Sequence, residues 1–172
     1  MDAVRNLFVV ILLIAGLSSQ TPTGPRPEWD DPAVLQIGTV KPHASMTIYP
    51  SAALAKRGDR ARSPWYRSLN GQWKFHYAPS PASRPAAFSQ AGFDDSKWSR
   101  IRVPASWETQ GFGMPIFVNI GYAFPYDRQN PRPPRDDNPV GSYRRAFTIP
   151  AEWSGRRVFL TFDGVADRKS VV

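Results

Sequence analysis

Pairs of adjacent carboxylates are the residues of this sequence that could most directly perform acid–base chemistry. They are Asp30-Asp31, Asp94-Asp95 and Asp136-Asp137. In glycoside hydrolysis one carboxyl group donates a proton while a second acts as nucleophile or base. Each pair, however, lies beside Pro, Ser or Asn, which are typical of turns and caps. We therefore expect the three pairs to serve in turns and caps.

Other candidate catalytic groups are few. His43 and His76 do not have the spacing of a zinc site, and His76 is expected on the surface of a strand. The chain has no cysteine and no Gly-x-Ser-x-Gly motif. Gly111-Phe112-Gly113 lacks the strand and helix of a phosphate-binding loop and is expected to be a loop turn. The residues themselves supply no convincing catalytic group.

The N-terminus has the pattern of an export signal. Arg5 precedes an unbroken apolar run over residues 7–17, and Gly16, Ser18 and Ser19 supply small residues for cleavage. The run is shorter than the roughly 18 to 20 residues that a membrane-spanning helix needs. Residues 1–19 are therefore predicted to be a signal peptide. We expect an exported protein, periplasmic or secreted, with no membrane attachment after cleavage.

The formal net charge of +8 would suit a nucleic-acid-binding protein, because basic side chains release counterions from phosphates. The basic residues are mostly arginines scattered from Arg26 to Arg168. The one local cluster covers residues 56–62 and is interrupted by Asp59. No base-reading motif is recognisable, so we expect no nucleic-acid partner.

The elements that would position any site are short. Residues 20–67 are predicted to be an extended, Pro-rich linker and leading segment, in which Gly58 ends one or two helical turns that begin at Ser51. Further on, apolar and polar residues alternate, as in strands that bury one face. The predicted strands cover residues 73–77, 100–103, 142–149 and 157–162. Residues 93–98 are predicted to form a turn or the start of a short helix. Short strands, many prolines and little helix predict an all-β domain, a β-sandwich.

Several motifs occur in an order that is specific to one family. They are SLNGQWKFHYAPSP, FDDSKWSRIRVPASWETQGFGMPIFVN, NPVGSYRRAFTIP and WSGRRVFLTFDGV. From Asp31 to Val165 the sequence resembles the N-terminal sugar-binding domain of glycoside hydrolase family 2, and in particular that of the long bacterial β-galactosidases. The resemblance implies a jelly-roll β-sandwich over residues 68–166, incomplete at its C-terminal end.

The resemblance also implies where the chemistry lies. In the family this domain is followed by an immunoglobulin-like domain and a (β/α)₈ barrel with two catalytic glutamates, and such a barrel takes about 250 residues. Glu28, Glu108 and Glu152 match neither glutamate, so no catalytic residue is expected in this chain. The parent enzyme is expected to hydrolyse terminal non-reducing β-D-galactosyl residues with retention, as in lactose catabolism, while this fragment alone is inactive.

One substrate contact follows from the resemblance. In the family, the asparagine of the loop that here covers residues 116–122 hydrogen-bonds the galactosyl group, and Asn119 occupies its place. An amide donates and accepts at once without adding charge. Trp107 is a weaker candidate for stacking on a sugar, because the family context favours a structural aromatic under the loop.

No metal ligand or cofactor is expected in this chain. For the full-length family enzyme the resemblance implies Mg²⁺ and Na⁺, a galactoside substrate and a homo-oligomer. Two alternatives stay open. One is another family 2 glycosidase, a β-glucuronidase or β-mannosidase; the other is a secreted, non-catalytic carbohydrate-binding module.

The last six residues, 167–172, do not continue the family's pattern. They read DRKSVV, which is the translation of gat cgg aag agc gtc gtg, the start of a common sequencing-library adapter. Our hypothesis is that residues 167–172 are an artefact of that kind.

Overall fold

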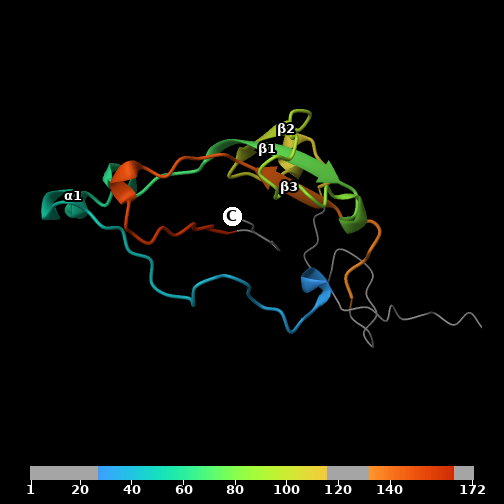
Figure 1. The fold of residues 1–172 in the computed structure, drawn as a ribbon, viewed down its shortest axis with the longest axis horizontal. Helices are drawn as coiled ribbons and strands as arrows, with labels where there is room; N and C mark the ends of the chain where they lie inside the picture. Colours follow the sequence, from blue (N-terminus) through green and yellow to red (C-terminus); the bar gives the residue numbers. More distant parts are fainter. Residues whose placement is uncertain (1–26, 116–131, 165–172) are drawn as a thin grey trace, which may run out of the picture.

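The computed structural model describes residues 27–115 and 132–164 (Figure 1). Within these ranges the chain forms a three-stranded antiparallel sheet and one short α-helix. The strands are β1 (Gly71–Ala78), β2 (Ser99–Val103) and β3 (Val140–Arg144), and the helix is α1 (Ala52–Arg57). Short 3₁₀ helices cover Glu28–Asp30, Arg60–Arg62, Pro81–Ser83, Glu108–Gln110 and Ala151–Trp153. The predicted signal peptide, Asn119 and the ending 167–172 lie outside the described residues.

The sheet has the order β2-β1-β3, so β1 is its central strand. Phe75 of β1 lies opposite Ser99 of β2 and Tyr143 of β3. The predicted strands at residues 73–77 and 100–103 are confirmed. The strand predicted at 142–149 exists but is shifted, because it begins at Val140 and its pairing ends at Arg144.

The two faces of the sheet have different coverings. Side chains alternate along a strand, so Trp73, Phe75 and Tyr77 share one face, which we call the Phe75 face. The loop that follows β2 covers this face with aromatic rings. The segment that precedes β2 lies against the opposite face, which carries Lys74 and His76 and which we call the Lys74 face. The fully buried apolar residues of the described chain are Phe75, Ala78 and Ile101.

Helix α1 has the local signals that the sequence predicts. The Ser51 hydroxyl accepts a hydrogen bond from the Leu54 N–H at 3.3 Å, and Gly58 ends the helix in the left-handed conformation with a φ of 68°. Figure 1 shows α1 at the end of the molecule remote from the sheet, near the 3₁₀ helix Ala151–Trp153. The Trp153 indole N–H donates to the Pro64 carbonyl at 2.9 Å and joins the two segments there.

The strand predicted at residues 157–162 is wrong. No strand is assigned to these residues, and Val158, Phe159 and Leu160 are exposed. The alternation of residue types predicts an extended backbone, but a strand also requires a neighbour with which to pair. The described residues provide no such neighbour for this segment.

The all-β class is confirmed, since the only sheet of the described chain is its main element and its one α-helix has six residues. The described residues contribute one sheet, and they do not form the second layer that a sandwich requires.

Candidate functional site

The loop that leads toward Asn119 is fixed to the outer edge of β2. The Gln110 side chain accepts a hydrogen bond from the Arg102 N–H at 2.7 Å and donates one to the Arg102 carbonyl at 3.1 Å. The Ser106 carbonyl accepts two hydrogen bonds, one from the Gln110 amide at 3.3 Å and one from the Thr109 hydroxyl at 2.8 Å. The loop therefore leaves the sheet from a defined position.

Trp107 lies in the same loop and packs on the Phe75 face. Its ring centroid is 6.0 Å from that of Phe75 and 5.9 Å from that of Tyr77. A methyl group placed on Gly141 of β3 would lie 2.3 Å from the Trp107 ring. Only a glycine at position 141 thus permits the indole to approach the sheet this closely. The packing uses much of the ring, and sugar stacking by Trp107 stays a prediction.

Phe112 and Tyr143 complete the aromatic group around Phe75. Their ring centroids are 4.6 Å and 4.7 Å from that of Phe75. Burial raises the pKa of the Tyr143 phenol, and the charge of Glu108 raises it further. Tyr143 therefore stays a neutral hydrogen-bonding group over a wide pH range.

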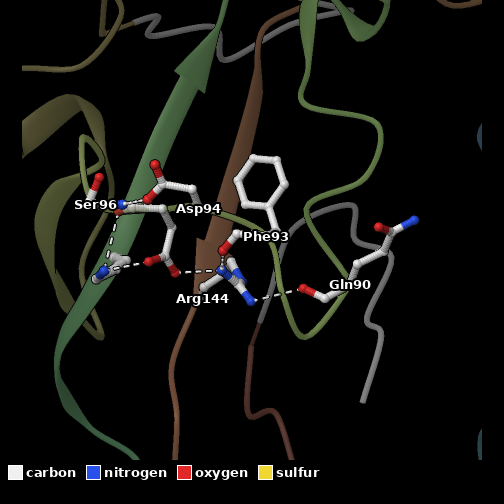
Figure 2. Close-up of polar contacts among 7 residues, drawn as sticks. Gln90, Phe93, Asp94, Ser96 and Arg144 are labelled. Atoms are coloured by element: carbon white, nitrogen blue, oxygen red, sulfur yellow. Dashed lines mark hydrogen bonds and ion pairs between the residues drawn. The ribbon is translucent and has the colours of Figure 1, made fainter.

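An ionic cluster holds the turn before β2 to the Lys74 face. Asp95 accepts hydrogen bonds from the Lys74 ammonium group and, at 2.6 Å, from the Arg144 guanidinium. Arg144 also donates to the carbonyls of Phe93 and Gln90, at 3.0 and 3.2 Å (Figure 2). The hydrogen bond from Lys74 is the main reason why the pKa of Asp95 lies below its usual value. The single carboxylate of Asp95 thus binds a cation from β1 and a cation from β3, and the cluster serves as a structural clamp.

The prediction that the carboxylate pairs serve in turns is confirmed for Asp94 and Asp31. Asp94 accepts from the Ser96 N–H at 2.9 Å, and this bond is the main cause of a lowered pKa at Asp94. Asp31 accepts from the Ala33 N–H at 2.9 Å. For Asp95 the prediction is wrong, since its carboxylate binds two strands instead of its own turn.

Asp30 likewise departs from the predicted turn role. It is buried, and its carboxylate receives the Arg135 guanidinium at 3.2 Å, with that of Arg132 at 3.7 Å. Arg135 also lies over the Trp29 ring, 5.8 Å from its centroid. These contacts tie the leading segment to the residues just before β3.

The sequence has relatives that place it in a family. The profile of the glycosyl hydrolases family 2 sugar binding domain matches residues 66–172. The chain belongs to glycoside hydrolase family 2.

Individual members of the family show the same relationship. The domain is 36% identical to a beta-galactosidase of Priestia megaterium over 147 residues, which is 84% of this chain and 14% of that protein. It is 40% identical over 139 residues to a beta-galactosidase of Halalkalibacterium halodurans, covering 78% of this chain and 13% of the relative. A beta-galactosidase large subunit of Leuconostoc lactis is 33% identical over 155 residues. The family 2 chain spans about one seventh of the length of the first two relatives.

The two histidines of this family 2 domain each contact a nearby structural group. His43 contacts the Lys41 carbonyl at 2.9 Å, within its own exposed segment. The His76 ring lies 5.5 Å from the Trp98 ring and is half-buried, so the prediction of a strand-surface histidine is wrong. Trp98 covers it because the clamp of Asp95 holds the preceding turn on this face.

Metal-binding clusters and membrane-spanning helices can be assessed only for residues 27–115 and 132–164. These residues hold no group of three or more His, Asp or Glu side chains arranged for a metal ion. None of their helices is long and apolar enough to span a bilayer. Asn119 lies outside these ranges, and its role stays a prediction.

Sequence reasoning missed the Asp95 clamp, although a signal for it exists. Lys74 and Arg144 are directly paired across β1 and β3, so two positive charges lie side by side on one face of the sheet, where both side chains are partly buried. A charge in such a position requires a partner, and a carboxylate in a turn next to the sheet is the available one.

Proposed function

We propose that this chain is the sugar-binding portion of an exported β-galactosidase that hydrolyses terminal, non-reducing β-D-galactosyl residues. The observation that carries the proposal is that relatives matching about four fifths of this chain are named beta-galactosidase. Because the chain spans about one seventh of their length, the activity belongs to the whole protein.

The contribution of this chain would be recognition of the galactosyl group through Asn119. The anchored loop supports this role. Gln110 fixes the loop to β2, and Trp107 fixes it to β1 and β3, nine and twelve residues before Asn119. A side chain that must meet sugar hydroxyls benefits from such fixed starting points, because less conformational entropy is lost on binding.

The bond cleavage itself would use residues outside this chain. In a retaining glycosidase one carboxyl group protonates the leaving oxygen, and the second forms a glycosyl-enzyme that water then hydrolyses. The three described glutamates have other environments. Glu28 lies in the 3₁₀ helix Glu28–Asp30, Glu108 in the loop near Tyr143, and Glu152 in an exposed 3₁₀ helix. We assign no acid–base or nucleophilic role to them, and no step is routed through a metal ion.

A chimeric enzyme tests the proposal. Residues 31–165 of this chain replace the matching segment of the Priestia megaterium beta-galactosidase, and nitrophenyl β-galactoside, β-glucuronide and β-mannoside are assayed side by side. We expect hydrolysis of the galactoside. Asn119→Ala should lower kcat/KM by roughly 10- to 100-fold, the effect of an unpaired polar group at a binding site.

Gln90→Ala is the matched control, since its amide side chain is exposed and far along the chain from the loop. Preference for the glucuronide or mannoside would overturn the substrate assignment. Equal kcat/KM for Asn119→Ala and Gln90→Ala would remove Asn119 from the site. The purified 172-residue chain should release no nitrophenol. Release of nitrophenol by that chain would contradict the proposal that bond cleavage uses residues outside it.

A further inference from the structure

Basic side chains gather at the end of the molecule that lies away from the sheet. We call this region the basic end. It comprises Lys56, Arg57, Arg60, Arg62, Arg156 and Arg157. The first two lie in α1 and the next two in the 3₁₀ helix Arg60–Arg62. The last two come shortly after the 3₁₀ helix Ala151–Trp153. Figure 1 shows these elements together, remote from β1, β2 and β3.

Two arginines of the basic end are held by aromatic rings. The Arg156 guanidinium lies 3.8 Å from the centroid of the Trp65 ring, and that of Arg60 lies 4.6 Å from the centroid of Tyr66. The hydrogen bond from Trp153 to the Pro64 carbonyl joins the two segments that contribute these residues. Stacking on a ring occupies the face of a guanidinium and leaves its N–H edge available for bidentate binding.

The charge of the basic end is only partly compensated. The six positive charges exceed the three carboxylates of the region, Asp59, Glu152 and Asp163, by three. Asp163 lies 3.9 Å from Arg60 but is 80% exposed, and Asp59 lies 3.4 Å from Arg62 with both side chains largely exposed. Such exposed ion pairs are weak and exchange readily for another anion. In the Asp95 clamp, by contrast, the cations Lys74 and Arg144 share a carboxylate that is largely buried.

We propose that the basic end binds an acidic glycan, a polysaccharide that carries sulfate or carboxylate groups. Repeated anions along a polymer would meet several guanidinium edges at once, and the release of counterions would add to the affinity. Membership of a glycoside hydrolase family favours a glycan over other polyanions. The Trp65 and Tyr66 rings lie under arginines, so these faces are not free to stack on bases or to enter a bilayer.

This surface differs from the loop that leads to Asn119, and its binding requires no catalysis. The acidic-glycan proposal can therefore fail while the proposed β-galactosidase activity holds, and the reverse is equally true.

Binding of dextran sulfate to the 172-residue chain, in dilute solution at about 0.15 M salt, tests the proposal, with neutral dextran as the reference. We expect binding of dextran sulfate alone, with an affinity that falls as salt rises. Arg60→Gln/Arg156→Gln should weaken binding by about tenfold or more. Lys97→Gln/Arg100→Gln removes the same charge from exposed positions beside and on β2, and should change binding by less than about twofold.

A footprint on the unmodified chain makes the test independent of how the variants fold. Dextran sulfate should protect Arg60 and Arg156 from phenylglyoxal, as mapped by mass spectrometry, while Arg100 and Arg102 stay reactive. Equal protection at all four arginines, or none, would overturn the proposal. So would an equal loss of affinity in the two double variants. Tighter binding of duplex DNA, or vesicle binding that Arg60→Gln/Arg156→Gln abolishes, would assign the basic end to a different partner.

Discussion

The side-chain amide of Gln110 hydrogen-bonds both the N–H and the carbonyl of Arg102, at 2.7 and 3.1 Å. Arg102 stands on β2, an outer strand of the three-stranded sheet. An outer strand presents unpaired backbone groups that can pair with another chain. The amide of Gln110 takes the place of a neighbouring strand at this position, and so it both fixes the loop and covers the edge.

Removing this amide should loosen the edge of β2. In Gln110→Ala the Arg102 N–H loses its acceptor, and a hydrogen bond contributes about 1 kcal/mol to stability. We expect hydrogen exchange at the Arg102 amide to become roughly five- to tenfold faster. Gln90→Ala serves as the control, because the Gln90 side chain is exposed. An unchanged exchange rate in Gln110→Ala would mean that the loop does not depend on this amide.

Gly141→Ala should displace Trp107. The added methyl group would meet ring atoms of Trp107 at 2.3 and 2.5 Å and of Phe75 at 2.7 Å. Overpacking of this kind costs about 1–3 kcal/mol. We expect a weaker near-ultraviolet circular dichroism signal and a red-shifted tryptophan emission. Gly92→Ala is the matched control, since a methyl group there meets nothing within 4 Å; identical spectra for the two variants would contradict the close packing.

The Asp95 clamp should make the sheet sensitive to acid. An unfolded aspartate titrates near a pKa of about 3.9, and the pKa of Asp95 lies lower in the folded chain, chiefly because of Lys74. Its stabilising contribution is therefore present above about pH 4 and is lost as the pH falls through the lower, folded value. We expect the near-ultraviolet signal of the wild-type chain to decline over that acidic range.

Asp95→Asn isolates the clamp from other acid effects. The variant keeps the shape of the side chain but loses the charge, so it should already show the weakened signal at neutral pH and respond less to acid. Asp136→Asn removes one carboxylate from an exposed turn and should retain the wild-type pH profile. If Asp95→Asn and the wild-type chain titrated alike, the acid response would have another origin.

The sequence predicts local structure here better than long-range contacts. The strands around Phe75 and Ile101 follow from alternation, since both side chains are buried and their neighbours are less so. The Asp94 turn and the Gly58 helix end also depend only on nearby residues. Asp95 has the same residue type as Asp94 and lies next to it, yet its partners are 21 and 49 residues away. No local pattern distinguishes these two aspartates.

The candidate site also combines features that the local sequence predicts with contacts that it does not. The aromatic loop is recognisable from the order of its residues, but the contact between Trp107 and Gly141 depends on the pairing of β1 with β3. The strand predicted at residues 157–162 was wrong because alternation specifies an extended backbone and not a neighbour. A long-range arrangement of this kind is set by the whole sheet, which a local pattern cannot contain.

Exposed apolar side chains should make the isolated chain associate with itself. Leu35 and Met46 are 87% and 90% exposed, and Val158, Phe159 and Leu160 form an exposed run. An extended run of β-prone, uncharged residues pairs readily with its copies. We expect Val158→Lys/Leu160→Lys to reduce light scattering of the purified chain, because charges within such a run oppose pairing. Ala86→Lys/Ala87→Lys adds the same charge at exposed positions and should reduce scattering less. A monomeric wild-type chain with a cooperative thermal transition would show that these side chains do not cause self-association.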